Sequence, residues 1–287
     1  MRLARLAWLL LIPLVPAIQQ RIDRRHENAP AGESVLYFQN GAQLRKLAPG
    51  FEDLLADFYW LRTVQYFGQQ RAFGVSKTYA LLEPLIEVTT DLDPKLEVAY
   101  RYGALFLCEP WPQGKGDPQA GIRMLEKGVR NLPQSWRLRQ DLGYYRYLFL
   151  GDAAGGARVL IEAARLPGAP FFLETLAGAI LAQGGERHAS RMIWQRLYEQ
   201  AESDFARENA RFNLLRLDGL DALDTLNAAV QRYVASHGRP PEGPEELVAA
   251  GLQRRLLLDP TGVAFEYDRE PGRFRFSRQS RLWWSQT

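Results

Sequence analysis

Small residues recur at regular positions within the apolar segments of the middle of the chain, and they constrain the fold more than any other feature. Gly103, Gly143 and Ala177 each lie inside an apolar segment, and 34 positions separate Gly143 from Ala177. A small side chain lets two helices approach closely, while large apolar residues on either side fill the seam. Because one such pair of helices cannot bury its apolar face alone, we expect several pairs to stack on one another.

Turn-forming residues divide this region, from about residue 56 to residue 202, into helical segments. Asp93-Pro94 and Asp117-Pro118 are each expected to begin a helix, because the Asp side chain accepts a hydrogen bond from a free amide and proline loses nothing at the first helical position. Gly151-Asp152 is predicted to end one helix and start the next, and Leu166-Pro167-Gly168 to end the helix that follows. Pro84 is expected to kink the first, degenerate helix pair.

Three segments carry the pattern of small and large apolar residues: "EVAYRYGALFL", "RQDLGYYRYLFLGDAAGGARVL" and "LETLAGAILAQGGERHASRMI". The pattern resembles the tetratricopeptide repeat (TPR) family, whose period is 34 residues. The resemblance extends over three repeats and one partial repeat, and it implies a mainly α fold, a TPR-like α-solenoid of antiparallel helix pairs over residues 51–202. Arg139 stands where the family has an aromatic residue, and "EPWPQGKGDP" is an insertion. A plain helical bundle is the alternative.

Members of this family bind a peptide or a partner helix in a concave groove, which the first helix of each pair lines. The resemblance implies that the lining residues here are Glu97, Tyr100, Leu107, Arg137, Gln140, Tyr144, Tyr147, Phe171, Glu174 and Leu181. Tyrosine and arginine suit recognition because they combine rigid contact area with directional hydrogen bonds. The alternative is that the tyrosines pack between helices, with each hydroxyl group reaching solvent.

The last part of the chain, residues 203–287, is predicted to be a long helix followed by a small helix–turn–hairpin (α+β) module. One face of the long helix carries apolar residues at helical spacing: Leu220, Leu223, Leu226, Val230, Tyr233 and Val234. Gly238 is expected to end this helix, and a short helix is expected to begin at Pro244 and to end at Gly251. Two runs of alternating apolar residues on either side of "DREPG" predict a β-hairpin.

The order of these features resembles the globular tail of the major pseudopilins of type II secretion. The matching residues are Tyr233, Gly238, Pro240, Leu247, Gly251, Leu252, Asp259, Pro260, Gly262, Phe265 and Tyr267. Thr261 and Ala264 depart from the family's pattern, and the N-terminus lacks the signature that prepilin peptidase cuts, so the chain is not interpreted as a pilin subunit. Pseudopilins can bind calcium near this point, where Asp259, Glu266, Asp268 and Glu270 lie here; a solvated hairpin without metal is the preferred interpretation.

The N-terminus is expected to direct export. Arg2 and Arg5 precede an apolar run from Leu6 to Ile18, which is shorter than the ~20 residues that a membrane span needs. Residues 1–20 are interpreted as a signal anchor, with a cleaved signal peptide and a soluble amphipathic segment as alternatives. Residues 21–50 are interpreted as a tether with short ordered pieces. The predicted location is the cytoplasmic membrane, single-pass, with the body on the outer (periplasmic) side.

Composition and motifs give no support for an enzyme, a metal site or a nucleic-acid-binding protein. The formal charge is only +3, and the basic residues are scattered. The three histidines, His26, His188 and His237, have no second histidine or cysteine at ligand spacing. Cys108, the single cysteine, is expected to be buried. We therefore expect no catalytic residues, no metal and no cofactor.

These observations predict an exported, membrane-tethered scaffold that binds a protein or peptide partner of the cell envelope, such as a component of pilus-like or secretion machinery. The first alternative is a permanent structural subunit of a membrane complex, in which the groove is filled by this chain or by a fixed neighbour. The second alternative is an enzyme accessory protein.

Overall fold

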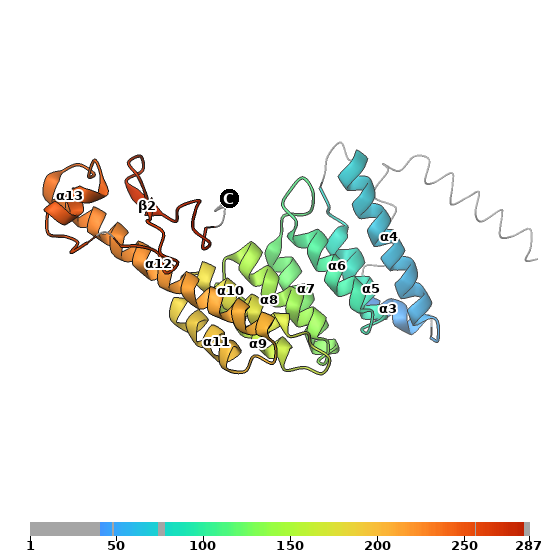
Figure 1. Ribbon diagram of the computed structural model, residues 1–287. Coiled ribbons are helices and arrows are strands. Elements are labelled where there is room, and N and C mark those ends of the chain that lie inside the picture. The colour runs from blue at the N-terminus through green and yellow to red at the C-terminus, as the bar shows by residue number, and fades with distance from the viewer. Residues whose placement is uncertain (1–40, 48, 74–77, 256, 284–287) are drawn as a thin grey trace, which may run out of the picture. The chain divides into compact units, whose positions relative to one another are not determined.

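The computed structural model describes residues 41–283 except for residue 48, residues 74–77 and residue 256, and in this part the chain is mainly helical (Figure 1). The prediction of a mainly α fold is therefore confirmed. The predicted signal anchor, residues 1–20, and residues 21–40 of the predicted tether lie outside the described residues. None of the described helices combines the length and the apolar character that crossing a membrane requires.

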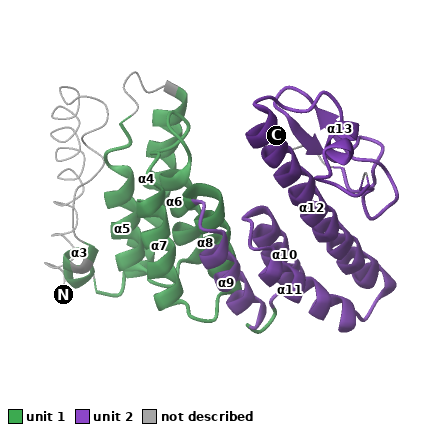
Figure 2. Cartoon of the chain, turned by 90° about the vertical axis from the view of Figure 1, so that its left-hand side faces the viewer, with its two compact units in different colours: residues 1–150, 166–168 green, residues 151–165, 169–287 purple. Residues whose placement is uncertain are grey.

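The chain divides into two compact units (Figure 2). Unit 1 comprises residues 1–150 and 166–168, and unit 2 comprises residues 151–165 and 169–287. The region predicted to hold the repeats, residues 51–202, therefore extends over both units.

Unit 1 consists of helices joined by short connections. They are α3 (Gly41–Leu47), α4 (Glu52–Phe73), α5 (Leu82–Leu92), α6 (Glu97–Cys108), α7 (Pro118–Asn131) and α8 (Trp136–Leu150). Helix α5 packs against α3, α4 and α6, and α7 packs against α6 and α8. Leu82, Leu85, Ile86 and Leu92 of α5 are fully buried, because this helix has neighbours on several sides.

Small residues in unit 1 lie at points of close helix contact, as the sequence predicts. A Cβ atom added to Gly103 would lie 2.8 Å from Cγ2 of Ile86 in α5. A Cβ atom on Gly121 would lie 2.8 Å from the carbonyl oxygen of Ala104 in α6, and one on Gly128 would lie 2.8 Å from Cγ of Tyr100. Gly143 of α8 is buried, and in unit 2 so is Ala177.

Helix starts in the middle of the chain follow most of the predicted capping residues. Asp117 accepts a hydrogen bond from the amide of Ala120 at 3.0 Å and starts α7 with Pro118. Asp152 likewise accepts from the amide of Gly155 at 2.8 Å and starts the next helix. The prediction for Asp93 is wrong: its side chain accepts from the amide of Lys95 at 2.8 Å, which makes a local turn, and α6 begins only at Glu97.

The expected kink at Pro84 is also wrong. Helix α5 begins at Leu82, so Pro84 is its third residue. The first intrahelical hydrogen bond comes from the amide of Leu85 to the carbonyl oxygen of Leu81, at 3.0 Å. Proline lacks an amide proton at a position where that proton has no intrahelical partner, so it costs the helix nothing.

Unit 2 combines further helices with a small antiparallel sheet. Its elements are α9 (Ala153–Ala164), α10 (Phe172–Gln183), α11 (Arg187–Glu199), α12 (Asp204–His237), α13 (Pro244–Ala249), β1 (Glu266–Asp268) and β2 (Arg273–Arg275). Helix α10 packs against α9 and α11, and α12 packs against α11, α13 and β2. The predicted hairpin is confirmed, with Tyr267 opposite Phe274 in the register of β1 and β2.

The C-terminal module folds around the second half of α12. Its core contains the predicted apolar face of that helix and apolar residues of the hairpin: Leu223, Leu226, Ala229, Val230, Tyr233, Leu247, Phe265, Phe274, Phe276 and Leu282. Gly219 admits the ring of Phe276, because a Cβ atom there would lie 2.7 Å from it. The amide of Phe274 donates to Oδ1 of Asn227 at 2.7 Å, which fixes strand β2 along the helix.

The turn between α12 and α13 has the predicted form. Gly238 ends α12 with a φ of 71°, a left-handed conformation that glycine adopts without strain. Pro244 occupies the first turn of α13, and Gly251 follows that helix with a φ of 70°. The Tyr267 hydroxyl group donates to the carbonyl oxygen of Pro241 at 2.9 Å and thereby ties the hairpin to the proline turn.

Candidate partner-binding surfaces

The predicted groove residues of α6 lie in the interior more than on a surface. Tyr100 has no exposed area, its hydroxyl group accepts a hydrogen bond from Nδ2 of Asn131 at 2.7 Å, and burial raises its pKa. Leu107 is fully buried as well. Tyr100 and Leu107 therefore pack unit 1 together and do not line an exposed groove, which corrects the prediction for both residues.

Polar contacts join α6 to α8 and to Ser135, the residue directly before α8. Glu97, another predicted groove residue, accepts a hydrogen bond from the Ser135 hydroxyl group at 2.9 Å. Nε of Arg101 lies 2.5 Å from Oδ2 of Asp141, with both side chains mostly buried. Burial raises the pKa of Asp141 even though the Arg101 guanidinium opposes the shift. Glu97 is thus partly engaged within unit 1.

The predicted residues of α8 are more accessible. Arg137 is exposed, with its guanidinium carbon 4.5 Å from the centroid of the Trp136 ring. Tyr144 is also exposed, whereas Gln140 and Tyr147 are half-buried. Among the predicted groove residues of unit 1, Arg137 and Tyr144 are therefore those best placed to contact a partner.

In unit 2 the predicted residues Phe171 and Glu174 lie at the start of α10. Phe171 is 76% exposed, an unusual state for a phenylalanine. The carboxylate of Glu174 accepts a hydrogen bond from Nη2 of Arg196 in α11 at 3.2 Å. Leu181, at the other end of α10, is buried and does not reach a surface groove.

Phe171 lines a groove of about 610 Å³ formed by α10, α11 and the first turns of α12. We call it the Phe171–Phe205 groove, and its lining residues include Phe171, Thr175, Trp194, Leu197, Phe205 and Ala210. Phe205 is 77% exposed, whereas Trp194 is almost completely buried. The Ser203 hydroxyl group accepts from the amide of Ala206 at 3.2 Å, so the start of α12 is fixed beside the groove. The groove offers an apolar surface to a ligand.

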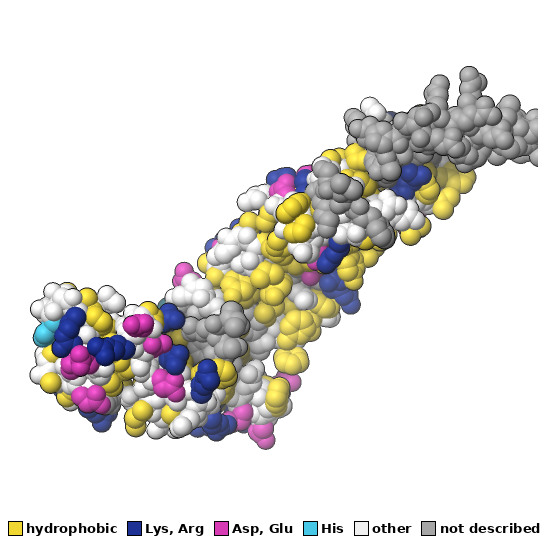
Figure 3. Space-filling view, turned by 90° about the horizontal axis from the view of Figure 1, so that it is seen from above, with side chains coloured by type: hydrophobic (Ala, Val, Ile, Leu, Met, Phe, Trp, Pro, Cys, Tyr) yellow, Lys and Arg dark blue, Asp and Glu magenta, His cyan; other side chains and the backbone are white. Residues whose placement is uncertain are grey.

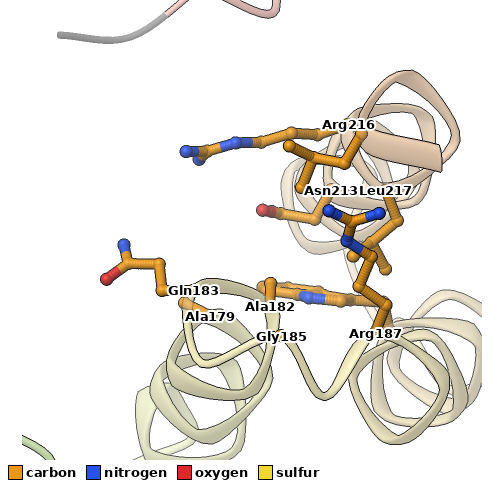
Figure 4. A pocket seen from close by; sticks show the side chains of 10 residues that line it. Ala179, Ala182, Gln183, Gly185, Arg187, Asn213, Arg216 and Leu217 are labelled. Carbon is orange, nitrogen blue, oxygen red and sulfur yellow. The ribbon is translucent and has the colours of Figure 1, made fainter. Parts of the chain in front are cut away.

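A second pocket, of about 320 Å³, lies farther along α12 and is lined by both apolar and polar side chains (Figure 4). Arg216 and Asn213 project from α12, and Arg187 projects from the start of α11 on the other side (Figure 4). Trp194 and Leu217 supply apolar surface. Burial lowers the pKa of the Arg216 guanidinium.

A third pocket, of about 450 Å³, lies between α12 and strand β2. Arginine side chains from the hairpin region line it together with aromatic rings: Arg273, Phe274, Arg275, Phe276, Arg278 and Trp283. Seen from above, basic and acidic side chains are interspersed over the C-terminal module, whereas hydrophobic side chains cover broader areas elsewhere (Figure 3).

One face of helix α4 carries exposed apolar side chains in unit 1. Phe51, directly before the helix, and Leu54, Phe58 and Leu61 are between 45% and 65% exposed. Their spacing of three and four residues places them on one stripe of the helix. Contiguous apolar stripes of this kind are typical of surfaces that bind another molecule.

Candidate metal ligands do not cluster in the described part of the chain. Its His, Cys, Asp and Glu residues form no cluster of three or more that could hold a metal ion. Asp259, a candidate calcium ligand, instead accepts hydrogen bonds from Thr261 and Val263 and from the Ser280 hydroxyl group. Cys108 is buried, as predicted, and burial raises the pKa of its thiol to about 12, so the thiol stays protonated at neutral pH.

Comparisons with known proteins add nothing to this geometry: no family model, no curated protein and no solved structure matches the chain.

Proposed function

We propose that this protein is a membrane-tethered helical scaffold of the cell envelope, and that it holds a peptide or helix of another protein in the Phe171–Phe205 groove. The observation that carries the proposal is the groove itself, where Phe171 and Phe205 are 76% and 77% exposed around about 610 Å³ of space. Burial of two such side chains against a partner would remove a large apolar surface from water.

The chemistry of the groove favours an amphipathic helix or an apolar peptide over a small polar ligand. The exposed rings of Phe171 and Phe205 provide rigid contact area that loses little conformational entropy on binding, and the buried Trp194 lies between them among the lining residues in the chain. Trp194 packs closely against Gly178 of α10, where an added Cβ atom would lie 3.0 Å from the indole ring. Helices that bind in grooves use apolar side chains spaced three or four residues apart, and Phe171 and Phe205 offer two aromatic rings for such side chains to contact.

A stack of antiparallel helix pairs is the arrangement that we propose for the scaffold. Contacts along α6 and α7 support it: Gly121 faces Ala104 and Cys108, whereas Gly128, one heptad later, faces Tyr100. The contact on α6 thus moves backward as the position on α7 moves forward. Burial of Gly103, Gly143 and Ala177 fits the TPR-like repeat that the sequence predicts. The envelope location rests on the sequence of residues 1–20.

Serine substitutions in the groove test the proposal. Phe171→Ser and Phe205→Ser should each release the same partner from the tagged full-length chain, because each removes an aromatic ring from the binding surface. Met192→Ser is the matched control, since Met192 is 63% exposed on α11 and does not line the groove. Proteins that co-purify from detergent-solubilised membranes are quantified by mass spectrometry.

The expected result is a protein that is depleted at least tenfold in both phenylalanine variants and unchanged in the Met192 variant. Thermal melting should show that the three variants are folded, because substitutions at exposed positions change the free energy of unfolding little. A set of co-purifying proteins that is the same in all variants would contradict the proposal.

A permanent structural subunit is the second candidate, and the exposed apolar stripe on α4 favours it. Leu54 and Leu61 are 65% and 60% exposed, and a fixed neighbour would cover them in an assembled complex. The two functions differ in the behaviour of the purified chain. A scaffold with an open groove is isolated as a monodisperse monomer in detergent, whereas a permanent subunit is isolated only with its neighbours.

A further inference from the structure

The two pockets along α12 adjoin each other. Arg187 and Leu220 line both the pocket beside Trp194 and the pocket beside strand β2. Together the pockets extend along α12 from Asn213 to Asn227, which corresponds to about 21 Å at ~1.5 Å per helical residue. We call this combined surface the arginine groove.

Positive charge dominates the lining of the arginine groove. Five arginines line it, Arg187, Arg216, Arg273, Arg275 and Arg278, against one carboxylate, that of Asp224. Carboxylates in and near the groove already neutralise some of these charges. Arg187 pairs with Asp221 at 3.2 Å and with Asp224, and Arg275 pairs with Glu266 at 3.3 Å.

Arg273 and Arg278 differ from these arginines. Neither side chain forms an ion pair with any carboxylate in the described part of the chain. Both residues are exposed at the rim of the groove, on strand β2 and just beyond it. The groove therefore presents cationic groups whose charge is available to a ligand.

Beneath the arginines the floor of the groove is apolar. Leu223, Phe274 and Phe276 are each at most 7% exposed, and Trp283, which is 44% exposed, forms part of the wall. The strand that carries the arginines is held in place, since the amide of Phe274 donates to Asn227 of α12. An apolar floor with a cationic rim fits a ligand that alternates apolar and acidic groups.

We propose that the arginine groove binds an acidic peptide segment of a partner protein in extended form, with carboxylates at Arg273 and Arg278 and apolar side chains on the floor. A groove of about 21 Å accommodates six or seven residues at ~3.3 Å per residue. A small anion would use only one end of this length. The floor is recessed between α12 and β2, which suits a single peptide strand better than the surface of a lipid bilayer.

This site differs from the Phe171–Phe205 groove in chemistry, and of the lining residues the two grooves share only Trp194. None of its arginines lines that groove. The proposal therefore stands or falls independently of the proposed function, and Phe171→Ser leaves it unaffected.

Binding of a defined probe to the full-length chain in detergent tests the proposal. The probe is a fluorescent eight-residue peptide of alternating glutamate and leucine, and its counterpart carries lysine in place of glutamate. The test variant is Arg273→Ser with Arg278→Ser. The matched control is Arg232→Ser with Arg254→Ser, which removes the same charge from two exposed positions outside the groove.

The glutamate peptide should bind the wild-type chain and the control variant equally, and about tenfold more weakly the Arg273/Arg278 variant, since two charge-assisted contacts are lost. The lysine peptide should not bind. Raising the salt concentration should weaken wild-type binding more than binding to the test variant, because screening affects the pairs at the rim. A photoreactive version of the glutamate peptide should label residues of α12 or β2.

Several results would overturn the proposal. Equal weakening in the test and control variants would indicate diffuse attraction of charge without a site. Binding to vesicles that contain an anionic phospholipid, without binding to the peptide, would indicate a membrane surface. A large gain in affinity when residues 284–287 are deleted would mean that the chain's own C-terminus is the occupant. Labelling elsewhere in the chain would exclude this groove even if the arginine variant failed to fold.

Discussion

The carboxylate of Asp259 joins two parts of the C-terminal module that are far apart in the sequence. Its Oδ1 accepts hydrogen bonds from the amides of Thr261 and Val263 at 2.8 and 2.9 Å, and its Oδ2 accepts one from the Ser280 hydroxyl group. Burial alone would raise the pKa of Asp259, but these hydrogen bonds outweigh burial, so the pKa is lowered. The turn at Pro260 and the C-terminal segment are thus held together by an ionised side chain.

Asp259→Asn should destabilise the protein by about 2 kcal/mol at pH 7, because hydrogen bonds to a charged acceptor are replaced by weaker or missing ones. A lowered pKa contributes stability above the unfolded value, which is about 3.9 for aspartate, and that contribution is lost as the pH falls through the folded value. In urea titrations, the difference between wild type and variant should therefore be constant above about pH 5 and should shrink below pH 4. A difference that is independent of pH would refute this role of the charge.

Glycines in the helices of unit 1 differ in what surrounds them, and this determines what alanine would do. Gly121 faces the backbone of α6, where an added Cβ atom would lie 2.2 Å from Sγ of Cys108 and 2.8 Å from the Ala104 carbonyl oxygen. Gly68 of α4 has no atom within 4 Å of the same position. One glycine is required by packing, whereas the other only weakens its helix.

Gly121→Ala should lower the free energy of unfolding by about 1–3 kcal/mol, because the helices must move apart. Gly68→Ala should raise it by about 0.5–1 kcal/mol, since alanine is the better helix former. Chemical denaturation of both variants measures the two effects. If Gly121→Ala were as stable as Gly68→Ala, α6 and α7 would not be in the close contact described.

At the scale of elements, the ion pair between Arg101 and Asp141 joins α6 to α8. It is short, 2.5 Å, yet burial raises the pKa of Asp141 while the hydrogen bond to Asp141 raises the pKa of Arg101. A raised pKa disfavours the charged form of Asp141 but favours the charged form of Arg101, so the two shifts have opposite effects on the stability of the ion pair. Desolvation of the carboxylate therefore offsets much of the attraction, and the pair orients the helices more than it stabilises them.

A comparison of a single and a double variant with the wild type checks this balance. Asp141→Asn should cost about 1–3 kcal/mol, because Arg101 then stays half-buried without its partner, whereas Arg101→Met with Asp141→Leu should change stability by less than about 1 kcal/mol. Urea denaturation gives the free energies of unfolding of the three proteins. A double variant that is as unstable as Asp141→Asn would show that the pair itself supplies net stability.

Local features of the elements could be predicted from the sequence, but features that depend on distant residues could not. Asp117 and Asp152 cap their helices as predicted, because each is followed at once by a helical segment. Asp93 does not cap a helix, because its side chain accepts a hydrogen bond from the amide of Lys95 instead. Nothing in the local sequence indicates this alternative. The resemblance places Tyr100 in a groove, yet its side chain is fully buried and its hydroxyl group accepts a hydrogen bond from Asn131 of α7.

In the candidate sites, too, local features could be predicted from the sequence, whereas features that depend on distant residues could not. The exposure of Phe171 was expected from its position in the repeat pattern. The sequence does not predict the place of Phe205 in the groove, because the exposure of its side chain depends on where Ser203 caps the start of α12 beside α10 and α11. Arg273 and Arg278 reach the arginine groove through the register of the hairpin on α12, which the spacing of residues along the chain does not reveal.

At the scale of the whole molecule, unit 2 contains two surfaces of different chemistry. The Phe171–Phe205 groove is apolar, whereas the arginine groove has a cationic rim. Two such surfaces on one chain suit a scaffold that holds two segments at once, because linked weak contacts raise the effective concentration of each. The exposed side chains of Phe171 and Phe205 support the proposed binding of a partner.

Photo-crosslinking in intact cells tests most directly whether the Phe171–Phe205 groove holds a segment of another protein. A photoreactive amino acid replaces Phe205 in the full-length chain, and in a second strain it replaces Met192, which is also exposed but lies outside the groove. We predict one protein, identified by mass spectrometry, that is crosslinked from position 205 and not from position 192. Identical products from both positions, or no product from position 205, would contradict the proposed groove.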